Sequence, residues 1–303
     1  MKIPPPSDST VSRIFKSWEA REKPSNSRRL GASQIGRPCD RELWYSFHWA
    51  KLNKFEGRML RLFEKGRTEE SWIELDLKEI GVEFLELDAE TGKQWEFSEL
   101  GDHFVCKLDG AACGFIEAAA TWHVVEIKTA NQSAFDKVVK EGCKKAKPEH
   151  YAQMITGMGM SGMDRAAYIV VNKNTEEIYF ERITMDKTEW KRILQRAKEI
   201  IFGDIPERIN ESAAWYQCKF CNFNSICHEC GECAAKNCRT CGFATSLEAG
   251  GWACDDDNTV IPIEKQKIGC DKHQFRNGMI PTVAEDVLNV FGGKIVDEEN
   301  LSV

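Results

Sequence analysis

The uneven distribution of cysteine is the feature that most constrains how this chain can fold. Of the thirteen cysteines in 303 residues, nine lie between Cys218 and Cys270. In a reducing compartment, clustered cysteines indicate metal binding rather than disulfide bonds. We therefore expect a metal-bearing C-terminal third behind an N-terminal part that has an ordinary hydrophobic core.

The composition is that of a globular protein, with 42% hydrophobic and 29% charged residues. No apolar run approaches the roughly 20 residues that span a bilayer, and the first residues, MKIPPPSDST, lack the pattern of a signal peptide. We expect a cytoplasmic protein with no membrane contact. The net charge of −7 argues against indiscriminate nucleic-acid binding. This net charge still allows a local basic groove. A carboxylate-lined site would itself contribute to the negative charge.

Apolar spacing predicts one mixed α/β domain up to about residue 210. A hairpin is expected to turn at Asn174, and Asp186 with Glu189 predicts a capping box at the start of the last helix. Gly81 is expected to end the long helix. The expected helices span 9–23, 39–47, 55–80, 131–142, 147–162 and 187–202, and the expected strands span 82–87, 103–110, 122–130, 166–173 and 177–184.

Charged residues interrupt two of the apolar strands. Asp109 ends the strand over 103–110, and the next strand carries Glu126 and Lys128. Side chains at i and i+2 of a strand point the same way, so Glu126 and Lys128 share a face, and Ile127 points to the other. Charges inside buried strands are costly unless something is bound there. The alternative is a surface salt bridge between Glu126 and Lys128.

Paired carboxylates are hard oxygen ligands for Mg²⁺ or Mn²⁺. A metal held by Asp109 and Glu126 could polarise a phosphodiester and lower the pKa of bound water. Lys128 could then orient the nucleophile or stabilise charge on the phosphorane. The trio therefore favours phosphodiester hydrolysis.

The segments LDG and VVEIKTA resemble the PD-(D/E)XK nuclease superfamily, in particular its RecB-like and lambda-exonuclease-like branches. The motif GRTEE matches the helix before the sheet in those families and supplies Glu70, with Glu69 as the alternative. The motif HYAQ matches the helix after the sheet and supplies Tyr151 and Gln153. The chain departs from the common Q-x-x-x-Y pattern, because Gly157 follows Gln153 by four residues.

The resemblance implies a restriction-endonuclease-like core and a role for each of these residues. Asp109, Glu126 and the backbone carbonyl of Ile127 would bind the metal, and Glu70 would complete its coordination directly or through water. Lys128 would assist the attacking water. Gln153 would brace Lys128 or a phosphate.

The segment CKFCNFNSIC places three cysteines in a C-x2-C-x5-C pattern. Three thiolates leave a cluster or a tetrahedral ion one ligand short, and Cys39 is the candidate for the fourth. This arrangement resembles RecB-like nucleases that carry a [4Fe–4S] cluster, namely AddB-type helicase-nucleases and CRISPR-associated iron–sulfur exonucleases. The resemblance implies a cluster at Cys39, Cys218, Cys221 and Cys227; zinc in the same four thiolates is the alternative.

A second cysteine group follows, and its C-x2-C and C-x2-H pairs predict a zinc-ribbon-like module. Four ligands would come from Cys238, Cys241, Cys254, Cys270 and His273, and spacing does not decide which of the five is left out. Cys230 and Cys233 allow a different, compact four-thiolate site, and a second iron–sulfur cluster is a third option. Cys106, Cys113 and Cys143 are interpreted as small buried hydrophobic residues.

Together these features predict a polar arm over 1–30, a nuclease core over 31–230 closed by the cluster, a zinc module over 231–280 and an acidic tail over 281–303. DNA is the expected partner, and the candidate contacts are Arg37, Arg41, Lys144, Lys145 and Tyr151. The resemblance implies an Mg²⁺- or Mn²⁺-dependent DNA exonuclease of DNA end processing, recombination or phage replication. A recombination or replication partner protein, a homo-oligomer and a phage origin are left open. The main alternative is a catalytically silent nucleic-acid-binding module; an iron–sulfur redox protein is disfavoured, because no dinucleotide fingerprint accompanies the cysteines.

Overall fold

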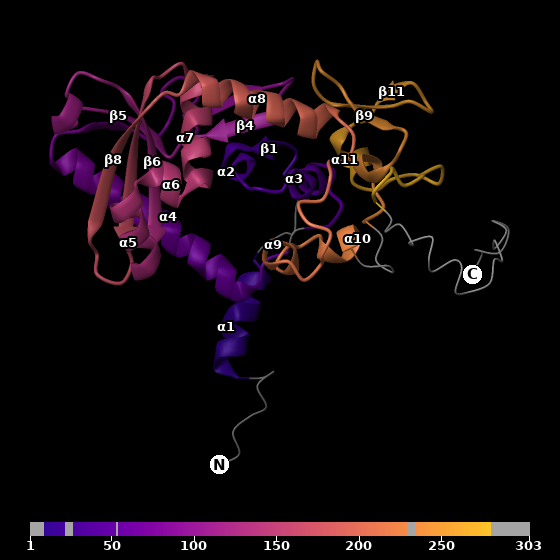
Figure 1. The fold of residues 1–303 in the computed structure, drawn as a ribbon, viewed down its shortest axis with the longest axis horizontal. Coiled ribbons are helices and arrows are strands. Elements are labelled where there is room, and N and C mark those ends of the chain that lie inside the picture. Colours follow the sequence, from indigo (N-terminus) through magenta and orange to yellow (C-terminus); the bar gives the residue numbers. More distant parts are fainter. Residues whose placement is uncertain (1–8, 22–26, 53, 229–233, 280–303) are drawn as a thin grey trace, which may run out of the picture.

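The structure, a computed structural model, describes residues 9–21, 27–52, 54–228 and 234–279. Figure 1 shows a body of strands and helices from which α1 and the start of α4 project, with the cysteine-rich C-terminal region beside it. The predicted tail over 281–303 lies outside the described residues. Within the described ranges, no helix is both long and apolar enough to cross a membrane.

The central sheet has five strands in the order β2–β5–β6–β7–β8. Only β6 and β7 run parallel, and the other neighbouring strands are antiparallel. The predicted mixed α/β class and the β7–β8 hairpin are therefore confirmed. The bounds are β2 (Glu83–Leu85), β5 (Gly110–Cys113), β6 (His123–Ala130), β7 (Arg165–Asn172) and β8 (Ile178–Thr184).

Local signals explain where two of the flanking helices begin and end. The Asp186 side chain accepts hydrogen bonds from the backbone N–H groups of Thr188 and Glu189 and so caps α8, which confirms the predicted start of the helix. The carboxylate of Glu189 pairs with Arg192, so the predicted capping box is only half formed. Helix α4 ends just before Gly81, whose φ of +85° is a left-handed conformation that glycine adopts readily. The helices of the body are α1 (Thr10–Glu19), α2 (Ala32–Ile35), α3 (Asp40–Phe47), α4 (Gly57–Glu79), α5 (Gln132–Glu141), α6 (Cys143–Ala146), α7 (Pro148–Ser161) and α8 (Lys187–Phe202), with a 3-10 turn η2 (Ile116–Ala118).

Strand β6 separates two layers of hydrophobic core. Val124 belongs to the larger hydrophobic cluster, which includes residues of α7 and α8. Ile127 belongs to a second cluster that includes residues of α4. Because side chains alternate along a strand, Glu126 and Lys128 lie on the same side as Val124, the side covered by α7. The packing therefore confirms the prediction that Ile127 points to the opposite face of β6 from Glu126 and Lys128.

The prediction of a single strand over 103–110 beside β6 is wrong. Strand β4 (Phe104–Lys107) pairs instead with β1 (Leu30–Gly31) and β3 (Glu96–Glu99) in a second sheet. Asp109 lies in the bend after β4, and the strand that pairs with β6 is β5, which begins at Gly110. At the start of β5 only glycine fits, because a Cβ atom at Gly110 would lie 2.4 Å from the ring of Phe84.

The C-terminal region forms a small antiparallel sheet in the order β11–β10–β9. Its residues Trp252 and Ile261 belong to the same hydrophobic cluster as Trp44 of α3. In the part of the chain that is described, this region therefore shares the core of the α/β body. Its elements, with the two helices before it, are α9 (Tyr216–Lys219), α10 (Asn224–His228), η3 (Cys238–Thr240), β9 (Ala244–Ser246), β10 (Trp252–Cys254), β11 (Thr259–Val260) and α11 (Ile263–Gln266).

Candidate active site

Asp109, Glu126 and Lys128 meet at one end of the β5–β6 pair. The register that pairs Gly110 with Val125 brings Asp109 beside Glu126. Oδ2 of Asp109 accepts a hydrogen bond of 2.9 Å from the backbone N–H of Ile127 and lies 3.6 Å from Nζ of Lys128. Lys128 also forms an ion pair with Glu126. The structure therefore brings the three charged residues together, inside the sheet rather than on an exposed edge.

The ammonium group of Lys128 marks a place for a cation. It contacts both carboxylates and also donates a hydrogen bond of 3.1 Å to the backbone carbonyl of Ile127. The side chain of Glu126 is only 2% exposed, and its Oε1 has the ion pair with Lys128 but no hydrogen bond of good geometry. A buried carboxylate oxygen of this kind is stabilised by a positive charge.

Burial dominates the electrostatics of this site. It raises the pKa of Glu126 to about 8; nearby Lys128 opposes this shift, and Asp109 adds to it. Burial by itself lowers the pKa of Lys128, but attraction by Glu126 and Asp109 outweighs burial, so that this pKa is raised overall. The lysine therefore stays charged, while the buried carboxyl group is ready to ionise when a further cation arrives.

Helix α4 contributes a third carboxylate, Glu70. Burial and then the charge of Asp109 raise the pKa of Glu70 to about 7, whereas Lys128 lowers it. The neighbouring Glu69 is also buried, but after burial its pKa responds to Glu176, which lies outside the site. Of the two glutamates that the sequence left open, Glu70 is therefore the one that faces Asp109 and Lys128.

Helix α7 covers the site and explains the missing tyrosine of the Q-x-x-x-Y pattern. Gln153 is buried on this helix. At Gly157, a Cβ atom would lie 3.0 Å from Cδ2 of Leu108 and 3.3 Å from Cγ1 of Val124. A tyrosine at Gly157 has no room, because α7 packs directly on the sheet there.

The sequence analysis overlooked His150 and Tyr168. Nδ1 of His150 lies 2.6 Å from the hydroxyl group of Tyr168, which pairs in register with Glu126 across β6 and β7. Burial, followed by the charge of Lys128, lowers the pKa of His150 to about 3, so the ring is neutral. One signal was available, because His150 precedes Gln153 by three residues and so shares its face of the helix.

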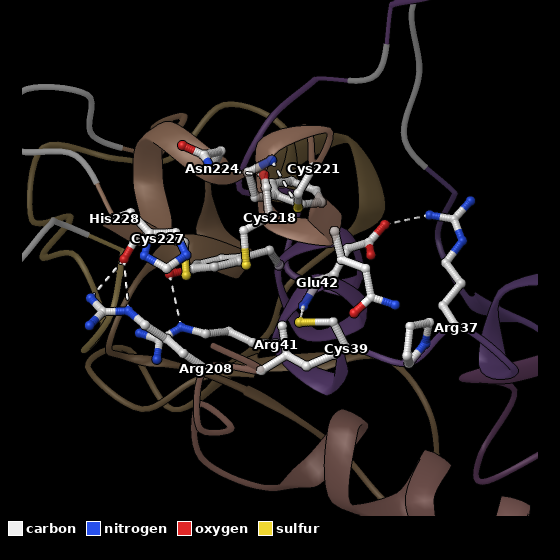
Figure 2. A pocket seen from close by; sticks show the side chains of 15 residues that line it. Arg37, Cys39, Arg41, Glu42, Arg208, Cys218, Cys221, Asn224, Cys227 and His228 are labelled. Carbon is white, nitrogen blue, oxygen red and sulfur yellow. Dashed lines mark hydrogen bonds and ion pairs between the residues drawn. The ribbon is translucent and has the colours of Figure 1, made fainter. Parts of the chain in front are cut away.

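The first cysteine group lines one cavity of about 270 Å³. Figure 2 shows Cys39 on one side of this cavity and Cys218, Cys221 and Cys227 on the other. Cys39 caps α3, and its sulfur accepts the backbone N–H of Glu42 at 3.4 Å. The structure therefore brings the distant Cys39 to the three C-terminal cysteines.

Three arginines line this cavity together with Glu42, which forms an ion pair with Arg37. Arg208 donates two hydrogen bonds, of 3.0 and 2.7 Å, to the carbonyl oxygen of Cys227. Burial raises the pKa of Cys221 to about 11 and also raises that of Cys39. The thiols therefore stay protonated until a metal draws off their protons. The cavity is also lined by Arg37, Arg41 and His228, the first two being predicted DNA contacts.

The cysteines of the second group, unlike those of the first, are not found lining one common cavity among the described residues. Burial raises the pKa of Cys238, and the charges of Cys270, Cys241 and Cys254 add to this shift. Nε2 of His273 lies 3.2 Å from the hydroxyl oxygen of Thr240. Cys230 and Cys233 lie outside the described residues.

The remaining predictions concern the three cysteines outside both groups and the basic residues around Lys144. Cys106 and Cys143 are buried as predicted, whereas Cys113 is partly exposed. Lys144 lies 4.9 Å from the ring centre of Tyr151 and 3.3 Å from Oδ2 of Asp186. Lys145 is exposed. Lys144 and Tyr151 therefore have protein partners, and a DNA role for these residues stays a prediction.

Among the described residues, no group of three or more His, Cys, Asp or Glu side chains is arranged so as to hold a metal ion as it stands. At the carboxylates, the ammonium group of Lys128 lies between the acidic groups. A metal ion at any of these sites therefore requires side-chain movement.

No family model matches this chain, and a search of curated proteins finds no match. Among solved structures, the chain is similar to the alkaline exonuclease LHK-Exo from Laribacter hongkongensis, with a TM-score of 0.42 and 18% identity over 61% of this chain and 90% of that chain. LHK-Exo in complex with dAMP gives a TM-score of 0.42 and 17% identity over the same shares, 61% and 90%. The structure of SSO0001 gives a TM-score of 0.44 and 16% identity over 73% of this chain and 97% of that chain.

Proposed function

We propose that this chain is a metal-dependent DNA nuclease of the PD-(D/E)XK type that hydrolyses phosphodiester bonds. One observation carries the proposal: the ammonium group of Lys128 contacts Asp109, Glu126 and the backbone carbonyl of Ile127. These are the three metal ligands that the family resemblance implies. A cation-binding position at this end of the sheet is what such a nuclease requires.

The oxygen atoms suit Mg²⁺ or Mn²⁺, because both ions prefer carboxylate and carbonyl ligands. Oε1 of Glu126 is buried without a hydrogen bond, so it is available as a ligand. Glu70, whose pKa of about 7 reflects the nearby Asp109, would add a carboxylate directly or through water. When bound here, the metal would polarise the phosphodiester and lower the pKa of a water molecule.

Side chains around this position would orient the reactants. With Asp109 and Glu126 holding a metal, Lys128 would no longer be needed to balance their charge, and it would orient the attacking water or stabilise charge on phosphate. Gln153 would brace Lys128 or a phosphate from α7. His150, neutral and hydrogen-bonded to Tyr168, would hold this part of α7 against β7.

Exonuclease action, as opposed to internal cleavage, follows from the family resemblance alone, as does a role in DNA end processing, recombination or phage replication. A partner protein, a homo-oligomer, a cytoplasmic location and a phage origin stay predictions. DNA as the substrate, rather than RNA, also follows from the family resemblance, because phosphodiester hydrolysis is common to both nucleic acids.

A [4Fe–4S] cluster at Cys39, Cys218, Cys221 and Cys227 belongs to the same proposal. The observation that supports a shared site is that Cys39, Cys218, Cys221 and Cys227 line one cavity of about 270 Å³. The choice of a cluster over zinc follows from the family resemblance. The arginines that line this cavity would offset the negative charge of a cluster with four thiolates. Its role would be structural, because it joins α3 to a segment far along the chain.

The test uses protein purified without oxygen and end-labelled linear or closed circular DNA, single- and double-stranded, with Mg²⁺, Mn²⁺ or EDTA. We expect metal-dependent loss of linear DNA that is abolished in Lys128→Ala and retained in Lys191→Ala, an exposed lysine of α8. Cleavage of closed circular DNA would support the nuclease assignment but would overturn exonuclease action. Absence of cleavage with every metal, by folded protein, would support the silent nucleic-acid-binding module instead.

A further inference from the structure

We propose that a cavity between the α/β body and the C-terminal module (the described residues 234–279) binds a phosphate group through Arg28 and Arg239. The cavity has a volume of about 370 Å³. It is lined by residues 28–29 and 101–103 of the body and by short segments of the module. None of the candidate active-site residues lines it, so this site is separate from the proposed nuclease centre.

Arg239 is a buried cation without a carboxylate partner among the described residues. It is only 2% exposed. Its Nη1 donates to the carbonyl oxygens of Arg28 and Phe47 at 3.0 and 3.1 Å, and its Nε donates to Oε1 of Gln266 at 3.0 Å. All three acceptors are neutral, whereas buried charges are normally paired. Stacking 3.9 Å above the ring centre of Trp49 offsets part of the cost of burial but adds no negative charge.

One edge of this guanidinium group is open toward the cavity. The three hydrogen bonds use Nε and Nη1, so Nη2 of Arg239 donates to no described residue. Among the described residues, only Glu126 and Trp252 have fully buried side-chain polar atoms without a partner, so Nη2 is accessible. Because Arg239 lines the cavity, a charged N–H donor is available there for a ligand.

Arg28 adds a second positive charge at the same cavity. Its side chain is exposed and lines the cavity. Burial, followed by the charge of Arg28, lowers the pKa of Arg239 to about 9, so that Arg239 is still charged at neutral pH. Arg29 also lines the cavity, but its charge is balanced by Glu96 and by Asp102, the one described carboxylate in the lining. Two neighbouring like charges disfavour each other, and an anion between them would relieve this repulsion.

A phosphate group matches this arrangement. Arginine binds phosphate through a planar fork of N–H donors. Arg28 and Arg239 have no carboxylate partner among the described residues, and a phosphate monoester carries about −1.5 to −2 charge at pH 7, more than a carboxylate. Gly250 and Gly251 also line the cavity and have no side chains to restrict access. Inorganic phosphate and the phosphate of a nucleotide offer the same chemistry. Either would bridge the body and the C-terminal module.

The first experiment needs no substitution. The full chain is purified without oxygen and titrated calorimetrically without added divalent metal, at constant ionic strength. Inorganic phosphate and thymidine monophosphate are the two probes, and acetate is the singly charged control. We expect one phosphate group per chain and acetate binding at least about tenfold weaker. Binding of both probes would assign the site to phosphate from either source, and binding of one probe alone would identify the source. Absence of binding by both, or acetate binding as tight as phosphate, would overturn the proposal.

Substitutions of the exposed Arg28 then locate the site. We expect Arg28→Gln to weaken phosphate binding at least about tenfold with the thermal midpoint unchanged in phosphate-free buffer. Lys191→Ala, an exposed lysine of α8, is the matched control and should bind phosphate as the unsubstituted protein does. Equal binding by Arg28→Gln and Lys191→Ala would overturn the proposed site.

Arg28→Glu tests the missing counter-charge directly. This variant places a carboxylate beside Arg239, so we expect loss of phosphate binding and a higher thermal midpoint in phosphate-free buffer. A lower midpoint, or phosphate binding that is retained, would overturn the proposal. Both measurements are made without DNA, so failure of DNA cleavage would bear only on the nuclease.

Discussion

The carboxylate site and the cavity of the first cysteine group are built in opposite ways. Asp109, Glu126 and Lys128 come from paired strands and adjoining sequence, and their side chains already touch. The cysteine cavity joins Cys39 to a segment that begins at Cys218, through helices α9 and α10 of four and five residues. Strand register fixes the first site before any metal arrives. The proposed cluster would hold the second site together.

The largest expected effect would come from Cys39→Ser. We expect this variant to lose its iron and about 5 kcal/mol of stability, because a link across so long a loop restricts the unfolded chain about as much as a disulfide does. Iron content and the thermal midpoint measure this. The partly exposed Cys113→Ser is the control. An unchanged thermal midpoint after loss of iron would show that the region around the cavity stays folded without a cluster, as the central sheet does without its metal.

Glu126→Gln tests whether the carboxylate site keeps its fold when it can no longer bind metal. The amide keeps the shape of the side chain and removes the charge that would bind metal. We expect cleavage to fall about 10²–10³-fold or more, with the thermal midpoint nearly unchanged. Single-turnover cleavage and thermal unfolding separate the two effects. Activity within tenfold of the unsubstituted protein would remove Glu126 from the proposed metal site.

The stability of the metal-free carboxylate site should fall as pH rises. The pKa of Glu126 is about 8 in the folded chain, against an ordinary value of 4.5. Between these values the unfolded chain has lost this proton and the folded chain retains it, so stability is greatest below pH 4.5 and is lost as pH rises through 8. Glu70, with a pKa of about 7, acts in the same direction.

We expect a loss of about 3–4 kcal/mol from Glu126 between pH 5 and pH 8, at 1.36 kcal/mol for each pKa unit, and a smaller further loss from Glu70. Urea unfolding without added divalent metal measures it. Added Mg²⁺ should reduce the loss, because it favours the ionised carboxylates. The slope should flatten in Glu126→Gln; an equal slope in that variant would assign the pH dependence to other groups.

Arg239→Ala gives the smallest expected effect, about 2 kcal/mol of stability. The substitution leaves the carbonyl groups of Phe47 and Arg28 without this donor and removes the stacking on Trp49. Arg239→Lys keeps the charge but lacks the planar fork, so we expect it to restore only part of the loss. Chemical unfolding measures both. Full stability of Arg239→Ala would mean that the C-terminal module is held to the body by its apolar contacts alone.

Much of the fold follows from local signals in the sequence. The alternation of β6, the β7–β8 hairpin and the cap at Asp186 depend on near neighbours, and each is observed. The break between β4 and β5 was missed, because β4 pairs with β1 and β3 whereas β5 pairs with β2 and β6, and β1 in particular is distant in the sequence. His150 was missed for a similar reason, since its partner Tyr168 is brought to it by the sheet.

The sequence by itself placed Glu126 and Lys128 on one face of a strand and grouped the cysteines in pairs. Those features depend on spacing, and spacing sets the direction of side chains within a strand or turn. Only the tertiary structure decided between Glu70 and Glu69, placed Cys39 beside Cys218, and left the ring of His273 bonded to Thr240. These choices depend on how distant elements pack, and contacts between distant segments are not encoded in the spacing of either segment.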